Sequence, residues 1–245
     1  MSASAVESRR EGRVGWIRLN RPEVKNALSA ASFEEIHRAI EAFDNDDDVG
    51  VIVVIGNGGV FSAGRDFRDT EVPPDFERRR TRAFEALEYC SKPTIAAVAG
   101  YAITGGLTLA LACDIIIAAQ SAVFQDTHAH LGVITLRASR LYEALGPLKC
   151  KELLFTSRRV SAQDALAMGL VNQIVPDEAL EVAASTMADQ IARHDANVLR
   201  AIKAVINEVI RRDQRNILDL EELAKRRFED GRPERASLVL NAGKK

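Results

Sequence analysis

Two patterns of hydrophobic and polar positions follow each other along the 245-residue chain. Up to about residue 130, short apolar runs alternate with polar and glycine-rich segments. The runs "VGVIVVIG", "KPTIAAVAGYAI" and "CDIIIAAQSAVFQ" have no polar face, which is typical of strands buried on both sides of a parallel or mixed sheet. After Gly132 most segments have helical periodicity, and "LVNQIV" interrupts them as a predicted strand. The pattern therefore predicts a strand-rich first half and a helical second half.

The first predicted helix covers about residues 29–44 and follows a predicted strand in "GRVGWIRLN". Ser32 with Glu35 predicts a capping box near its start. One apolar face at helical spacing consists of Phe33, Ile36, Ile40 and Phe43. A second such face, suited to core or subunit packing, consists of Leu199, Ile202, Val205, Ile206 and Ile210. Strands and helices in this order predict an α/β fold.

Composition and charge exclude several classes of protein. The formal net charge is −2, so no basic excess indicates a nucleic-acid partner. The apolar runs are too short to span a bilayer, and we predict no membrane association. The three cysteines lack disulfide or metal-site spacing, so we expect no metal and a reducing, cytoplasmic location. "MSASAVESRREGR" lacks the apolar stretch of a secretory signal, and we predict residues 1–10 as a disordered lead.

A pair of glycines, Gly105-Gly106 in "GYAITGGLTLALACD", stands where an apolar helix is predicted to begin. The first amides of a helix have no partner inside it and lie at the positive end of its dipole. The loop "SAGRD", residues 62–66, offers a second glycine-supported amide. Two amides that converge on one oxygen would form an oxyanion hole. The glycines could equally serve tight helix–sheet packing, and these residues alone leave both interpretations open.

Four blocks together resemble the crotonase, or enoyl-CoA hydratase/isomerase, superfamily: "RPEVKNALS", "VFSAGRDF", "KPTIAAVAGYAITGGLTLALACDIIIA" and "SAQDALAMGLVNQIVP". They occur in the family's order and spacing. The resemblance implies a crotonase-like spiral of ββα units over residues 11–190. It also implies a C-terminal helical trimerisation region over residues 191–245, and hence a homotrimer or a dimer of trimers. The superfamily hosts many reactions, so the resemblance says more about fold than about chemistry.

The resemblance further implies an acyl-CoA substrate, with coenzyme A present as part of that substrate and no separate cofactor. The N–H groups of Arg65 and Gly105 would hold the thioester oxygen and stabilise an enolate. The substrate-binding residues implied in this way are Lys25, Ala27, Ala63, Asp66, Arg68 and Gly106. Among them, Arg68 is expected to reach a CoA phosphate. A solvated surface charge is the alternative interpretation for Lys25 and for Arg68.

The acid–base groups depart from the hydratases that the chain resembles, which carry two glutamates. Thr108 stands at the place of the first, three residues after the oxyanion glycine, and His128 in "FQDTHAHLG" stands at the second. A threonine hydroxyl is too weak an acid or base to replace a carboxylate, so ordinary hydration is not expected. His128 can transfer protons near neutrality, or it can be a hydrogen-bonded pocket residue without a catalytic role.

Asp126 is near enough in sequence to orient a histidine, but we favour a structural role for Asp126 and for His130. His128 and His130 would share a face in a strand, whereas a loop would not fix their relative orientation.

Three functions of the protein stay open. The first is an enolate-forming acyl-CoA enzyme of lyase or isomerase type, and the second is an acyl-CoA-binding protein with little catalysis. The third is a β-diketone-type carbon–carbon hydrolase with His128 as base, because "FQD" before a histidine resembles that branch.

Overall fold

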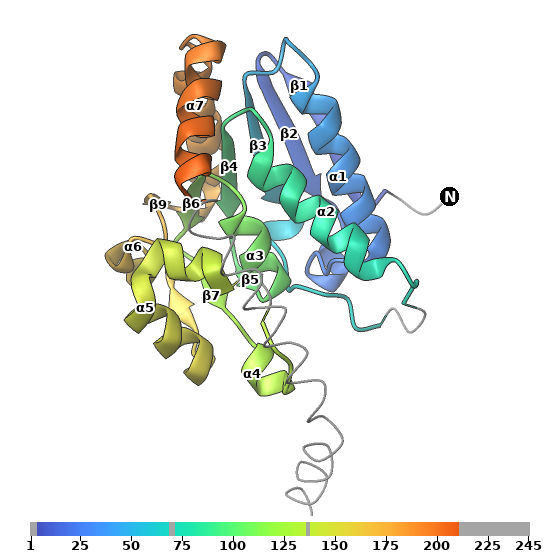
Figure 1. Cartoon of the computed structure of the whole chain (residues 1–245), viewed down its shortest axis with the longest axis vertical. Helices are drawn as coiled ribbons and strands as arrows, with labels where there is room; N and C mark the ends of the chain where they lie inside the picture. Colours follow the sequence, from blue (N-terminus) through green and yellow to red (C-terminus); the bar gives the residue numbers. More distant parts are fainter. Residues whose placement is uncertain (1–3, 69–71, 136–137, 211–245) are drawn as a thin grey trace, which may run out of the picture.

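The computed structural model describes residues 4–68, 72–135 and 138–210 (Figure 1). The strands are β1 (Val6–Glu11), β2 (Val14–Leu19), β3 (Val51–Gly56), β4 (Thr94–Val98), β5 (Tyr101–Ile103), β6 (Ile115–Ala119), β7 (Val123–Gln125), β8 (Val160–Ser161) and β9 (Gln173–Val175). The helices are α1 (Ala30–Asp44), α2 (Phe76–Tyr89), α3 (Gly105–Leu111), α4 (His128–Leu131), α5 (Ala138–Thr156), α6 (Ala162–Met168) and α7 (Leu180–Ala192). Residues 196–210 are also helical.

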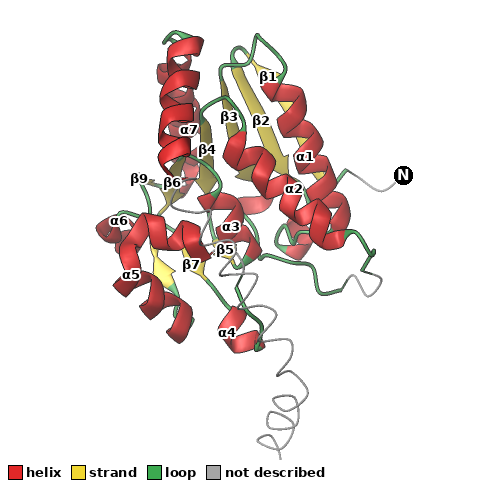
Figure 2. Cartoon of the chain, viewed as in Figure 1, coloured by secondary structure: helices red, strands yellow, loops and turns green. Residues whose placement is uncertain are grey.

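The strands form two sheets, which Figure 2 shows in yellow between the helices. The larger sheet has the order β1-β2-β3-β4-β6-β9, with β1 antiparallel to β2 and the other pairs parallel. The smaller sheet has the order β5-β7-β8. The chain passes from the larger to the smaller sheet between β4 and β5 and again between β6 and β7. With α3 after β5, this is the predicted ββα arrangement, and the α/β crotonase-like fold is confirmed.

The central strands of the larger sheet are apolar and covered on both faces. On β3, Ile52 and Val54 belong to one core cluster together with the apolar face of α1. Val51 and Val53 belong to a second cluster, which also contains Leu180, Ala184 and Ala188 of α7. Successive side chains of a strand point to opposite faces, so a strand covered on both sides needs apolar residues throughout. This explains why "VGVIVVIG" shows no polar alternation. Figure 1 shows α1 and α2 side by side and α7 apart from them.

Helix α1 confirms the predicted apolar face but not the predicted cap. Phe33, Ile36, Ile40 and Phe43 are all buried. The capping box is formed by Ser29 and Ser32, because the Ser32 N–H donates to Ser29 Oγ at 3.1 Å and the Ser29 N–H donates to Ser32 Oγ at 3.2 Å. The prediction that Ser32 pairs with Glu35 was therefore wrong.

The predicted disordered lead over residues 1–10 is also wrong where the structure describes it, because Val6–Glu11 form strand β1. This strand pairs antiparallel with β2, with Val6 opposite Leu19 and Glu11 opposite Val14. A turn at Gly12, with φ of 57°, joins the two strands. Only the first residue of β1 is buried. Backbone hydrogen bonds to β2 hold this edge strand, so its side chains carry no apolar alternation that the sequence could reveal.

The second half is helical, as predicted, with a break inside α5. Gly146 has φ of 71° and ψ of 174°, and Pro147 follows it, so α5 consists of two consecutive helical pieces, one on each side of Gly146. Most of the apolar face expected near the C-terminus lies on the surface, because Ile202, Val205 and Ile206 are exposed. Residues 211–245 of the predicted C-terminal region lie outside the described residues. No helix in the described ranges is long and apolar enough to cross a bilayer.

Candidate active site

The predicted site residues come from four segments that lie side by side at the edge of the smaller sheet. Parallel bridges join Leu28 to Arg65 and Ser62 to Ala102, which extends this sheet beyond β5. On the other side of β5, the Thr104 N–H donates to the Gln125 carbonyl at 2.8 Å. Figure 1 shows α3, β5 and β7 together at this place. Residues that are distant in the sequence, such as Ser62 and Ala102, are thereby neighbours.

The N–H groups of Arg65 and Gly105 belong to adjoining backbone segments. The bridge to Leu28 uses the Gly64 carbonyl, at 2.7 Å, and the Asp66 N–H, at 3.0 Å. Bonding groups alternate in direction along an extended strand, so the Arg65 N–H faces away from Leu28. A Cβ on Gly64 would lie 3.2 Å from the Gly105 nitrogen. Among the described residues, neither the Arg65 nor the Gly105 N–H donates a hydrogen bond.

The two glycines at the start of α3 have different surroundings. A Cβ on Gly106 would lie 2.4 Å from the Ser62 carbonyl oxygen, which no real side chain could tolerate without a backbone shift. A Cβ on Gly105 would meet its nearest atoms, Arg65 N and Gly64 Cα, at an ordinary 3.5 Å. Close packing therefore explains Gly106, whereas packing does not require a glycine at position 105.

Sequence reasoning missed Thr104, which precedes Gly105 and has φ of 50° and ψ of −101°. A non-glycine residue in such a conformation costs about 1–3 kcal/mol and persists only when its surroundings hold it. Its hydroxyl lies 2.6 Å from the Thr127 hydroxyl, which ties the start of α3 to the segment before His128. Its carbonyl accepts from the Thr108 hydroxyl at 3.1 Å. The sole sequence signal was a hydroxyl residue directly before a glycine pair.

His128 begins the short helix α4, so it lies neither in a strand nor in an irregular loop. Its Nδ1 is 2.9 Å from Oδ2 of Asp126, which is buried. Asp126 Oδ1 also accepts from the His128 backbone N–H at 3.0 Å. The carboxylate of Asp126 therefore contacts the histidine ring as well as the backbone of His128. His130 is exposed.

The residues expected to bind coenzyme A include one tight ion-pair group. Asp66 is buried and accepts from Arg68 Nε and Nη2, both at 3.1 Å, and it pairs with Arg21 Nη2 at 2.9 Å. Hydrogen bonding from Arg68, with a smaller contribution from Arg21, holds the pKa of Asp66 below its usual value. The guanidinium of Arg68 is thus engaged with a carboxylate of its own loop.

The other predicted substrate-binding residues surround this loop. Lys25 is exposed, and its Nζ lies 5.0 Å from the centre of the Tyr101 ring. Its carbonyl accepts from the Ala63 N–H at 2.9 Å, so the segments of Lys25 and Ala63 are adjacent. Ala27 is buried. In the described part of the chain, no three His, Cys, Asp or Glu side chains are grouped so that they could hold a metal ion.

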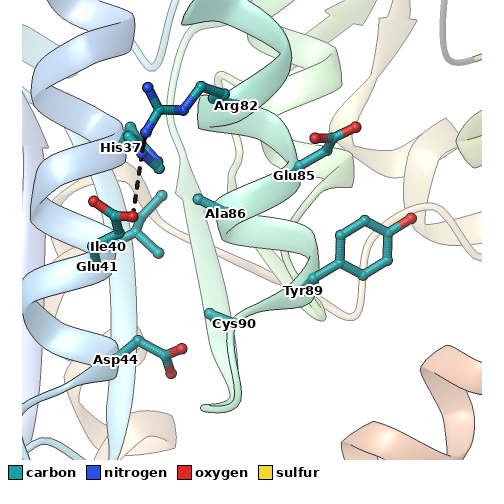
Figure 3. Close-up of a pocket in the computed structure, with 9 residues that line it drawn as sticks. All are labelled: His37, Ile40, Glu41, Asp44, Arg82, Glu85, Ala86, Tyr89 and Cys90. Carbon is teal, nitrogen blue, oxygen red and sulfur yellow. Dashed lines mark hydrogen bonds and ion pairs between the residues drawn. The ribbon is translucent and has the colours of Figure 1, made fainter.

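A surface pocket of about 320 Å³ lies between α1 and α2, away from these segments (Figure 3). Figure 3 shows Arg82 of α2 reaching toward His37 of α1, and the Arg82 Nη2 donates to His37 Nε2 at 2.7 Å. Glu41 lies 3.4 Å from the same nitrogen. None of the predicted site residues lines this pocket. His37 therefore joins two helices and belongs to a different region from His128.

The chain shares this architecture with known proteins. Residues 9–233 match the profile of the enoyl-CoA hydratase/isomerase family. A probable mitochondrial enoyl-CoA hydratase from Dictyostelium discoideum is 38% identical over 203 residues, which are 81% of this chain and 73% of that protein. A probable enoyl-CoA hydratase from Rhizobium meliloti is 38% identical over 214 residues, which are 84% of this chain and 82% of that protein. The crystal structure of an enoyl-CoA hydratase from Mycobacterium avium superposes with a TM-score of 0.83 at 34% identity, covering 94% of this chain and 99% of that one.

Fold and sequence define one class, an α/β protein of crotonase architecture. The chain belongs to the enoyl-CoA hydratase/isomerase family of the crotonase superfamily.

Proposed function

We propose that the chain binds an acyl-CoA thioester and stabilises its enolate between the N–H groups of Arg65 and Gly105. The observation that carries this proposal is that both N–H groups lie in adjoining segments and have no partner among the described residues. Hydrogen-bond donors that are already in place do not have to reorganise when negative charge develops on the oxygen. Removing one such donor typically lowers the rate by about 10²–10³-fold.

The acid–base groups argue for a reaction other than rapid hydration of a double bond. Thr108 donates its hydroxyl to the Thr104 carbonyl at 3.1 Å, and a hydroxyl is a poor acid or base at neutral pH. The second acid–base position holds His128, so no pair of carboxylates is available there. We therefore expect formation of an enolate, with isomerisation or another enolate reaction following from it.

The coenzyme A part of the substrate is proposed to lie along the segments of Lys25, Ala27, Ala63 and Asp66. Lys25 is the exposed cation of this group and suits a phosphate. The pairing of Arg68 with Asp66 supports a role in shaping the loop for both residues, in place of the expected phosphate contact.

We further propose a homotrimer or a dimer of trimers, because the helix at 196–210 exposes Ile202, Val205 and Ile206.

Two measurements test the proposal. Titration calorimetry with butyryl-CoA is expected to show binding, and mass spectrometry is expected to show exchange of its α protons in D2O. Binding without exchange would instead support an acyl-CoA-binding protein, and a lack of binding would refute both.

A third measurement tests the reaction type. Crotonyl-CoA hydration is expected to be slow in the wild type and faster in a Thr108→Glu, His128→Glu double variant. Rapid hydration by the wild type would show that the missing carboxylates do not matter.

A further inference from the structure

Asp126 and His128 are held together by more than one contact. The ring nitrogen Nδ1 lies 3.0 Å from Asp126 Oδ1 and 2.9 Å from Oδ2. The backbone N–H of His128 also donates to Oδ1, which closes a tight turn between residues 126 and 128. The Asp126 side chain is 8% exposed and that of His128 15% exposed. The carboxylate therefore has little freedom to leave the ring.

The turn is fixed to the predicted oxyanion segment. Thr127, between the two residues, has its hydroxyl 2.6 Å from the Thr104 hydroxyl, and its N–H donates to the same oxygen at 3.2 Å. Thr104 directly precedes Gly105. His128 directly follows Thr127, so His128 and Gly105 each lie one residue beyond the contact between Thr127 and Thr104.

The chemistry of the pair assigns the ring proton. An ionised carboxylate accepts hydrogen bonds and donates none, so Nδ1 must carry the proton in the neutral ring. Nε2 then keeps its lone pair, and in the described part of the chain it has no hydrogen-bond partner. A carboxylate behind Nδ1 also stabilises the imidazolium that forms when Nε2 takes a proton.

We propose that Asp126 is a positioning residue that fixes His128 in the Nδ1–H form and so makes Nε2 the proton acceptor of the site. This inference rests on the proposed function. The α C–H bond of the acyl group breaks, its electron pair forms the enolate held by the two N–H groups, and the proton moves to Nε2. The reverse transfer returns the proton to carbon, so no oxidant or further reactant is needed.

Neighbouring titratable groups differ from this pair. Cys150 is buried, and its pKa is raised by burial first and by the charge of Asp126 second, so it stays a thiol. His130 is exposed and lies in the same short helix. It therefore provides a matched control of the same residue type.

The first test does not depend on activity. Full-length protein with ¹⁵N-labelled histidine rings is studied by long-range ¹H–¹⁵N correlation, with His128→Gln and His130→Gln used for assignment. Neutral His128 is expected to be protonated at Nδ1 in the wild type and to shift toward the Nε2–H form in Asp126→Ala. A wild-type ring protonated at Nε2 would overturn the proposal, whether or not the protein exchanges protons of any CoA ester.

The second test uses exchange of the butyryl-CoA α protons and Asp126→Asn, which keeps an oxygen for the backbone N–H of His128 but removes the charge. The exchange rate at saturation is expected to fall by about 10²-fold or more with KM nearly unchanged. The acidic limb of its pH profile is expected to move to lower pH, because losing the anion lowers the basicity of the ring. His130→Gln is expected to retain the wild-type rate. Wild-type exchange and an unshifted profile in Asp126→Asn would overturn the assignment.

Discussion

The six-stranded sheet and the edge of the three-stranded sheet differ in backbone conformation and in the polarity of their side chains. The central strands of the larger sheet are regular and have apolar side chains on both faces, and residues such as Val53 and Ile52 are fully buried. At the edge of the smaller sheet the backbone leaves its preferred conformations, since Lys25, Asn26 and Thr104 all have positive φ. A rigid, well-packed scaffold can hold strained segments that carry polar groups. The apolar scaffold and the site that we propose therefore lie in different parts of one chain.

Asn26 shows how the strained edge is held. It is buried, and its side-chain amide donates to the carbonyls of Asn57 at 3.0 Å and Val60 at 2.6 Å. Its side-chain oxygen accepts from the Arg21 N–H at 2.8 Å. Hydrogen bonds thus fix this region where the larger sheet relies on apolar packing.

The largest expected effect separates the two adjacent glycines. Gly106→Ala would force a methyl group against the Ser62 carbonyl, and we expect a loss of about 3 kcal/mol or more in the free energy of unfolding. Gly105→Ala has space for the methyl group, so its stability should be nearly unchanged. That methyl group would lie 3.5 Å from the Arg65 nitrogen, and we expect exchange activity to fall by about 10²-fold. Urea unfolding and α-proton exchange measure the two effects, and equal stability losses would contradict the distinction.

A cavity in the scaffold should affect stability without altering the chemistry. Ile36 on α1 is fully buried, and Ile36→Ala is expected to cost about 2–5 kcal/mol in the free energy of unfolding. The rate of exchange per folded molecule should remain that of the wild type, because Ile36 lies outside the four site segments. Thermal unfolding together with exchange well below the midpoint checks this. A rate that falls while the protein is still folded would show that the two regions are coupled.

The ion-pair group at Asp66 should give a smaller, pH-dependent effect. Its pKa is lowered from 3.8 in the folded protein, mainly by Arg68. The pairing therefore stabilises the fold above this value and is lost as the pH falls through the folded pKa. Asp66→Asn is expected to be less stable by about 1–2 kcal/mol at pH 7, and the difference should shrink below pH 3.8. Urea midpoints across this range test the sign, and a difference that grows in acid would disprove the account.

The smallest expected change in folding stability concerns the exposed apolar side of the helix at 196–210. Ile202 is 52% exposed, so Ile202→Glu should alter the stability of the isolated chain by less than about 0.5 kcal/mol. If this side joins subunits, the same charge should dissociate the oligomer. Light scattering after size-exclusion chromatography measures the mass, and Lys149→Glu on the exposed part of α5 serves as a surface control. An unchanged oligomer would place the interface elsewhere.

Much of the scaffold could be predicted because its signals are local. The continuous apolar runs of β3, β4 and β6 and the periodic apolar face of α1 are patterns of residues close together in the sequence. Strand β1 could not be predicted in this way, since its polar side chains are exposed and its partner supplies the hydrogen bonds. The cap at Ser29 was missed because a capping box usually ends in Glu or Gln, a pattern that Ser32 with Glu35 matches and Ser29 with Ser32 does not.

The sequence by itself determined the alternation of buried strands and helices, the two glycine-supported loops and the family. Tertiary structure decided what the site residues touch. It separated Gly106, which packs on Ser62, from Gly105, and it engaged Arg68 with Asp66. It also joined Thr104 to Thr127 beside a histidine whose ring contacts Asp126. The reason is physical: periodicity records which side chains avoid water, whereas hydrogen bonds between distant loops depend on how the sheets bring those loops together.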